Sequence, residues 1–168
     1  MYSCKMRRMR DQGQKPLTTT RSSLLLVALS LSLLFTVLHG LEFTWLPVSG
    51  IKTKYAVVDA AAKGAPIVEK GDTVTVHATG IVQQGNKKFW STRDQGQKPF
   101  TYQAGVGGVI KGWDRGLLGA AVGESRKLDI PAEEGYGARG FPAWGIPPNG
   151  ALYFEITVIE IKGKRGEF

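Results

Sequence analysis

Residues 135–148 read Gly-Tyr-Gly-Ala-Arg-Gly-Phe-Pro-Ala-Trp-Gly-Ile-Pro-Pro, and a long alternating segment from Ala151 to Ile161 follows. The large apolar residues of the first stretch stand beside glycine and proline, without the 3.6 or 2 spacing of a core-facing helix or strand. Aromatic residues on such turn-forming segments are held at the surface by the scaffold beneath them. We therefore predict a concave apolar pocket that binds an apolar ligand or peptide and carries no nucleophile. Its predicted walls are Trp113, Tyr136, Trp144 and Phe154.

The remaining body has the pattern of one antiparallel sheet. Thr73 to Thr79 alternates strictly, and Ala151 to Ile161 reads as a long strand in which one face is shared by Leu152, Phe154, Ile156, Val158 and Glu160. Further strands are expected at 55–59, 88–92, 100–103 and 125–131. Val109 to Leu118 is the only convincing helix of the body. The sequence thus predicts an α+β fold, with an antiparallel sheet of about five strands curled around one short α-helix.

The excess of basic residues is concentrated at the N-terminus. The 168-residue chain has 22 Lys and Arg against 14 Asp and Glu, a formal net charge of +8, but six of these basic residues and only one acidic residue lie in residues 1–21. In the rest of the chain the two signs are interspersed, so it lacks the basic stripe that nucleic-acid binding requires. We expect no nucleic-acid partner.

The basic head precedes an apolar run, which predicts a targeting segment. Residues 22–41 carry no charge, and ~20 apolar residues suffice to span a bilayer, so a cleaved signal peptide and a signal anchor are equally consistent. An organelle-directed presequence is a third alternative. We predict a targeting segment (1–50), a folded domain (51–163) and a short basic tail (164–168). The domain would then lie in the lumen of the secretory pathway or of an organelle, and only the N-terminal segment would contact a membrane.

One segment occurs twice. Arg10 to Thr18 recurs almost unchanged as Arg93 to Thr101. Two copies at one long spacing do not make a repeat architecture, and we assign the duplication no function.

Phosphate and metal chemistry find little support. Gly105 to Gly112 is glycine-rich, but Ile110 and Trp113 stand where the phosphate-binding motifs need other residues. The only cysteine, Cys4, lies in the head, and His77 is the one histidine of the body, so we expect neither a metal site nor a catalytic triad. Glu133 and Glu134 are expected in solvent. No cofactor is predicted.

In their order along the chain, the remaining motifs resemble those of the FKBP-type peptidyl-prolyl isomerases. The resemblance covers about Lys52 to Lys162, essentially the whole body. It rests on Val76-His77-Ala78-Thr79-Gly80, Lys88-Phe89, Lys98-Pro99-Phe100, Val109-Ile110-Lys111-Gly112-Trp113, Gly135-Tyr136-Gly137-Ala138 and Ile146-Pro147-Pro148 before Leu152-Tyr153-Phe154. It implies a monomeric enzyme without a cofactor, which rotates residue–proline bonds in client proteins.

The resemblance also implies which residues form the site. Trp113 would be the pocket floor, and the Ile110 N–H and the Tyr136 hydroxyl would hold substrate carbonyls. The implied walls are Phe89, Phe100, Val109, Ile110, Tyr136, Ile146 and Phe154, with Phe141 and Trp144 on an overhanging loop.

The chain departs from the family pattern in this site. Ala78 replaces a common tyrosine, Trp90 an aspartate, Gly108 a glutamate and Phe141 a histidine. We count Ala78 and Trp90 among the substrate-binding positions and hypothesise that Trp90 fills the volume that Ala78 leaves. The lost aspartate predicts weak binding of rapamycin- or tacrolimus-type macrolides. The alternative function is a non-catalytic or weakly active proline-peptide binding module or chaperone.

Overall fold

Seven antiparallel strands and one short α-helix make up the part of the chain that the computed structural model describes, residues 43–163. The strands are β1 (Leu46–Pro47), β2 (Lys54–Asp59), β3 (Thr73–Val82), β4 (Lys87–Ser91), β5 (Phe100–Gln103), β6 (Ser125–Ile130) and β7 (Leu152–Ile161). The α-helix is α2 (Lys111–Gly116), and η1 (Ala132–Glu134), η2 (Gly137–Arg139) and η3 (Pro142–Trp144) are short 3-10 helices. The α+β prediction is confirmed. The two-residue strand β1 was not predicted, because two residues are too few to show alternation.

The predicted targeting run (22–41) and the tail (164–168) lie outside the described residues. The described compact unit begins at Phe43, and its β1 pairs with β2 through Leu46 opposite Tyr55. Within residues 43–163, no helix is both long and apolar enough to cross a bilayer.

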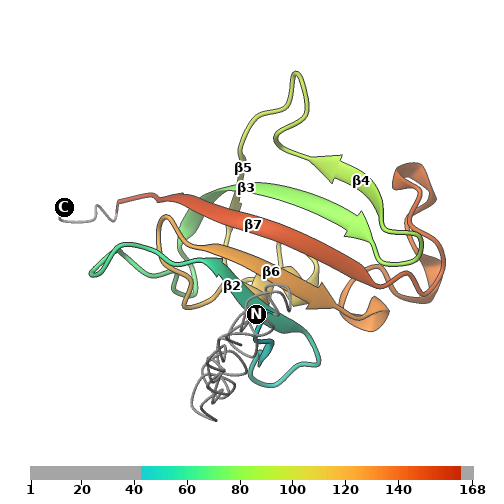
Figure 1. Cartoon of the computed structure of the whole chain (residues 1–168), viewed down its shortest axis with the longest axis horizontal. Coiled ribbons are helices and arrows are strands. Elements are labelled where there is room, and N and C mark those ends of the chain that lie inside the picture. Colours follow the sequence, from blue (N-terminus) through green and yellow to red (C-terminus); the bar gives the residue numbers. More distant parts are fainter. Residues whose placement is uncertain (1–42, 164–168) are drawn as a thin grey trace, which may run out of the picture. The chain divides into compact units, whose positions relative to one another are not determined.

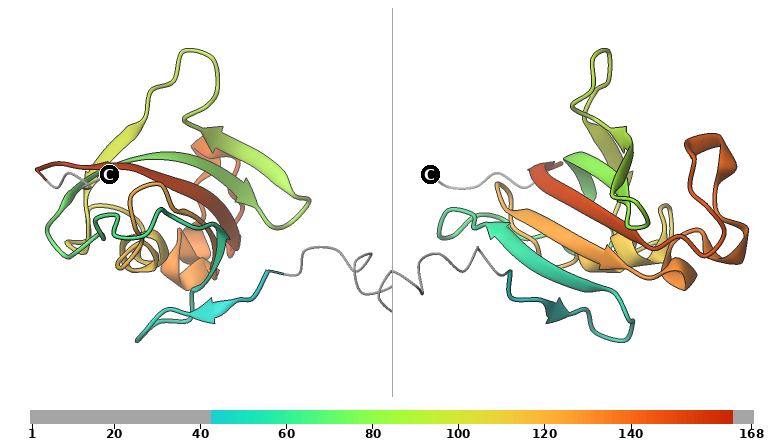
Figure 2. Two further views of the ribbon diagram at one scale, coloured as in Figure 1. Left: turned by 60° about the vertical axis from the view of Figure 1, so that its left-hand side comes forward. Right: turned by 45° about the vertical axis from the view of Figure 1, so that its right-hand side comes forward.

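The strands lie in the order β1-β2-β6-β7-β3-β4 (Figure 1). The long central strand β3 pairs with β7 along one edge, while its other edge is shared: β5 pairs with residues 73–76 and β4 with residues 79–82. The loop that joins β4 to β5 projects away from the sheet in every view (Figures 1 and 2). Between these two pairings, Thr92 bridges the edge of β3: its N–H donates to the carbonyl of Ala78 at 2.9 Å, and its hydroxyl accepts from Ala78 N–H at 2.9 Å.

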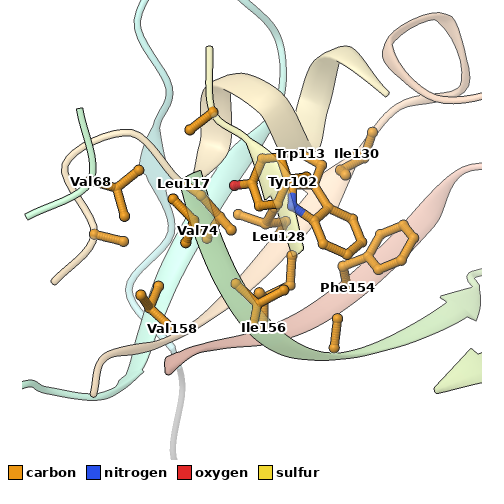
Figure 3. Packing of buried hydrophobic residues seen from close by; sticks show 14 of the residues in the cluster. Val68, Val74, Tyr102, Trp113, Leu117, Leu128, Ile130, Phe154, Ile156 and Val158 are labelled. Atoms are coloured by element: carbon orange, nitrogen blue, oxygen red, sulfur yellow. The ribbon is translucent and has the colours of Figure 1, made fainter. Parts of the chain in front are cut away.

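The sheet curls over α2 (Figure 2), and two helix glycines permit the close approach. A methyl group at Gly112 would lie 2.5 Å from Ile130 Cγ2, and one at Gly116 would lie 2.9 Å from a Leu128 methyl carbon. The helix can therefore contact β6 through its backbone. The side chains of the core, among them Leu117, Leu128 and Ile156, fill the space between helix and sheet (Figure 3).

The predicted face of β7 is wrong at its end. Val158 lies opposite Val76, but Glu160, two residues on, lies opposite Thr75, so β7 has one extra residue and a bulge at this point. The bulge reverses the alternation after Val158, so Ile161 is buried and Glu160 is exposed to solvent. Alternation alone cannot foresee such an insertion.

Candidate functional site

A cavity of about 470 Å³ opens beside α2, and aromatic side chains dominate its lining. It is lined by Trp90, Phe100, Gly107, Gly108, Val109, Ile110, Trp113, Tyr136, Trp144 and Phe154. The structure thus brings together eight of the residues that the sequence analysis placed at the site. None of the lining residues is acidic.

The floor of the cavity is also part of the hydrophobic core. Trp113 on α2 is 4% exposed and Phe154 on β7 is 2% exposed, and their rings meet edge to face at 4.9 Å between centroids. Phe100 of β5 also packs edge to face on the indole, at 5.8 Å between centroids. Strands and helix therefore hold these rings on several sides, as Figure 3 shows for Trp113 and Phe154. A floor built this way is fixed before any ligand arrives.

A β-bulge shapes the wall next to β4. Gly80 of β3 lies opposite Trp90, but Ile81 lies opposite Lys88, so Phe89 is the extra residue. Regular alternation would send Phe89 and Trp90 to opposite faces, yet both rings contact that of Trp144, at 6.0 and 6.3 Å. Gly80 makes room, since any side chain there would displace the ring of Phe89. Of Phe89 and Trp90, only Trp90 lines the cavity.

The overhanging loop contributes three aromatic rings, one within the 3-10 helix η3 and two just before η2 and η3. Tyr136, Phe141 and Trp144 contact one another at centroid distances of 5.1–6.4 Å. Phe141 and Ile146 exchange two backbone hydrogen bonds, of 2.9 and 3.1 Å, which close the loop at its base. Trp144 nevertheless remains 44% exposed and Phe141 37% exposed, so the loop rings lie mostly at the surface.

Four residues predicted at the site lie around the cavity without lining it. Phe89 supports Phe154 and Trp144 from behind, at 5.6 and 6.0 Å. Phe141 packs on Tyr136, while Ile146 and Ala78 are buried in the core at 1% exposure. The recorded ring contacts of Trp90 are with Phe100, Trp113 and Trp144. That Trp90 fills space left by Ala78 stays a prediction.

Two polar groups on the cavity wall can donate hydrogen bonds to a ligand. Among the described residues, none accepts a hydrogen bond from the backbone N–H of Ile110, whereas its carbonyl accepts one from Asp114 N–H at 3.0 Å. The second donor is the hydroxyl of Tyr136, which is half-buried, and burial raises its pKa above the ordinary value. The phenol therefore stays protonated at neutral pH.

Asp114 fixes the glycine loop that leads into the helix. Its carboxylate is buried and accepts hydrogen bonds from Gly105 N–H at 2.9 Å and Gly107 N–H at 3.1 Å. This clamp sets the course of the chain just before Val109 and Ile110, two residues of the cavity wall. Asp114 is not among the residues predicted at the site, and only its place after a glycine-rich loop hints at a role.

Glu134 is buried, contrary to the expected solvated pair, while Glu133 remains exposed. Glu134 accepts hydrogen bonds from Lys52 N–H, Thr53 N–H and the Thr53 hydroxyl, at 2.9, 2.8 and 2.6 Å. Burial alone would raise the pKa of Glu134, but these hydrogen bonds together lower it below its ordinary value. The sequence signal was ambiguous because adjacent glutamates usually face solvent.

Within residues 43–163, two buried side-chain polar atoms have no hydrogen-bond partner of standard geometry among the described residues. These are the hydroxyl of Tyr102 and the indole N–H of Trp113, on rings 5.9 Å apart (Figure 3). Burial raises the pKa of Tyr102 far above its ordinary value, so the hydroxyl is neutral. Within residues 43–163, no cluster of three or more His, Cys, Asp or Glu residues has the arrangement to hold a metal ion.

Comparisons with known proteins agree with this geometry. The family model of the FKBP-type peptidyl-prolyl cis-trans isomerases matches residues 64–159. The peptidyl-prolyl cis-trans isomerase FKBP12 of Arabidopsis thaliana is 54% identical over 94 residues, which are 55% of this chain and 84% of that protein. FK506-binding protein 1 of Debaryomyces hansenii is 48% identical over 98 residues, 58% of this chain and 85% of that protein.

A solved structure shares the fold. The crystal structure of AtFKBP13 is similar with a TM-score of 0.60 and 34% sequence identity, over 71% of this chain and 98% of that chain. The sheet curled on one short helix, the aromatic cavity beside that helix and the matched family model lead to one assignment: the chain belongs to the FKBP-type peptidyl-prolyl cis-trans isomerases (EC 5.2.1.8).

Proposed function

We propose that the aromatic cavity binds residue–proline segments of folding client proteins and accelerates rotation of the bond without a covalent step. The observation that carries the proposal is the combination of an apolar cavity of about 470 Å³ with two hydrogen-bond donors, Ile110 N–H and Tyr136 Oη, on its wall. A proline ring fits the apolar part, with Trp113 beneath it. The donors bind the carbonyl groups of the peptide.

The chemistry needs only a modest preference for the twisted bond. Rotation breaks amide resonance, a barrier of ~18–20 kcal/mol, and the uncatalysed reaction takes ~10–100 s. The twisted amide is less dipolar than the planar one, so a dry aromatic cavity disfavours the planar ground state more than the transition state. Each ~1.4 kcal/mol of this preference is tenfold in rate, and ~4 kcal/mol gives a thousandfold.

The test is isomerisation of a residue–proline peptide by the full-length chain, followed by NMR exchange spectroscopy. Tyr136→Phe keeps the ring and removes the donor, so kcat/KM should fall roughly threefold to tenfold, as the loss of one hydrogen bond predicts. Tyr153→Phe is the matched control, because Tyr153 stacks on Trp45 outside the cavity. Equal activity of all three proteins would refute the role of Tyr136.

We also propose that FK506-type macrolides enter the same cavity with reduced affinity. The relative from Debaryomyces hansenii is named an FK506-binding protein, but here Trp90 stands at the position of the family's aspartate and no acidic residue lines the cavity. Trp90→Asp should tighten FK506 binding in a calorimetric titration. Unchanged or weaker binding would show that the missing carboxylate is not the cause.

For the location of the enzyme we propose the lumen of the secretory pathway or of an organelle. The support is the basic head followed by the uncharged run 22–41. Microscopy and fractionation of the full-length chain, compared with a chain that lacks residues 1–41, test this. Identical distributions of the two chains would contradict it.

A further inference from the structure

A second, more open depression of about 710 Å³ adjoins the aromatic cavity. The two share Gly107 and Val109 in their linings, so a peptide that leaves the cavity over this rim enters the depression directly. Three basic side chains line it, those of Lys70, Lys111 and Arg115, and we call it the basic groove.

The three cations are held on separate supports around the groove. The aliphatic stem of Lys70 packs over Gly105, where an added methyl group would lie 3.0 Å from Lys70 Cγ. Lys111 and Arg115 are one turn apart on α2, which places them on the same side of the helix. Val106, a residue of the glycine loop that is 50% exposed, adds an apolar surface to the lining.

One carboxylate, that of Asp114, also lies in the lining and offsets part of this positive charge. Asp114 is buried, and both of its oxygens already accept backbone hydrogen bonds. Lys111 Nζ lies 3.8 Å from Glu134 Oε1, but that glutamate is held by three shorter bonds from Lys52 and Thr53. Among the described residues, no ion pair of Lys70 or Arg115 is recorded. The groove therefore presents an excess of positive charge beside an uncharged cavity.

We propose that the basic groove is a subsite for acidic side chains of the client, a few residues from the proline bound in the aromatic cavity. The proposal rests on the proposed function, since it needs the proline to be in the cavity. A Glu or Asp side chain in the groove lies within reach of several cations, and a carboxylate that meets more than one gains more than an isolated exposed ion pair. Continuity with the cavity favours a peptide as the ligand.

The experiment uses the full-length chain and a set of peptides that share one residue–proline pair. One further position carries Glu, Gln or Lys, and this position is moved from one to four residues away on either side of the proline. NMR exchange spectroscopy gives kcat/KM without a coupling protease. At the favoured positions and low salt, Glu should exceed Gln by roughly threefold to tenfold, with Lys below both. Because salt screens exposed charges over ~10 Å at 0.1 M, 0.5 M salt should remove most of the difference.

Two double variants distinguish the effect of the groove cations from the effect of the protein's net charge. Lys70→Gln with Arg115→Gln should remove most of the preference for Glu, since only Lys111 then remains in the groove, and should leave turnover of the Gln peptides unchanged. Lys63→Gln with Lys162→Gln removes the same charge from exposed positions outside the groove lining, and it should keep the preference. Equal turnover of Glu and Gln peptides at every position overturns the subsite. An equal loss of preference in both double variants also overturns it, because long-range charge would then be the cause. Failure of the proposed function differs from these outcomes, since no peptide would then be turned over.

Discussion

The floor and the overhanging loop of the aromatic cavity hold their rings in opposite ways. Trp113 and Phe154 in the floor are nearly inaccessible and are packed by helix, strands and other rings. Trp144 and Phe141 in the loop are more than a third exposed and contact mainly each other, Tyr136 and the wall rings. We therefore expect substitutions in the floor to affect both stability and activity, and substitutions in the loop to affect activity with little effect on stability.

This contrast predicts the largest effect at the floor. Trp113→Ala should lower the free energy of unfolding by about 3–5 kcal/mol, because it empties a buried site that several rings enclose. It should also abolish isomerase activity. Urea unfolding and NMR exchange measure the two effects. Trp113→Phe, which keeps an aromatic floor, should fold and retain part of the activity. Full stability of Trp113→Ala would contradict a floor that belongs to the core.

The loop has one point at which a small change should matter, its turn at Gly140. This residue has φ of 64° and ψ of −158°, and a methyl group there would lie 2.5 Å from backbone atoms of Ile146 and Pro147. Gly140→Ala should therefore displace the loop, with a loss of about 1–3 kcal/mol in unfolding free energy and a clear fall in activity. Gly163→Ala is a control at another positive φ, 82°, with nothing within 4 Å of the added carbon. Equal effects of the two variants would show that φ alone, rather than the close approach, is responsible.

Glu134 links the loop region to the start of β2, and its contribution depends on pH. Its pKa is lowered in the folded state, so it stabilises the fold above the pKa of the unfolded chain, and this stability is lost as pH falls through the lower folded pKa. At pH 7, Glu134→Gln should cost about 1.5–3 kcal/mol, since an amide nitrogen then faces donors. The gap between wild type and variant should narrow in urea titrations below about pH 4. Glu133→Gln, at an exposed residue, is the control. A gap that stays constant with pH would exclude the carboxylate as its source.

The floor and the loop also differ in how far the sequence predicted them. Alternation placed β3 and most of β7 correctly, since each buries one face in the hydrophobic core. The same rule failed where a strand has an extra residue. The extra residue Ile159 reverses which side chains are buried at the end of β7. The extra residue Phe89 allows its ring and that of Trp90 to contact Trp144 together. Bulges depend on pairing with a partner strand, which one segment of sequence does not contain.

Buried polar groups were the other feature that the sequence left open. Asp114 and Glu134 bind backbone N–H groups that lie seven to nine and about 80 residues away along the chain, so their partners become known only from the fold. The aromatic residues of the overhanging loop were easier to predict, because aromatic residues among glycines and prolines have few alternatives to lining a surface.

The smallest effect on stability is expected at Trp144, an exposed residue of the overhanging loop. Its side chain is 44% exposed and contacts Phe89, Trp90, Tyr136 and Phe141, so Trp144→Ala should change the unfolding free energy by no more than about 0.5–1 kcal/mol. It also lines the cavity, and its loss should raise KM for proline peptides severalfold while kcat changes less, because the floor and both donors remain. Trp45→Ala, which removes a tryptophan stacked on Tyr153, is the matched control and should leave KM unchanged. If Trp144→Ala instead destabilised the protein as much as Trp113→Ala, the loop would contribute to stability as much as the floor does. The proposed difference between floor and loop would then be wrong.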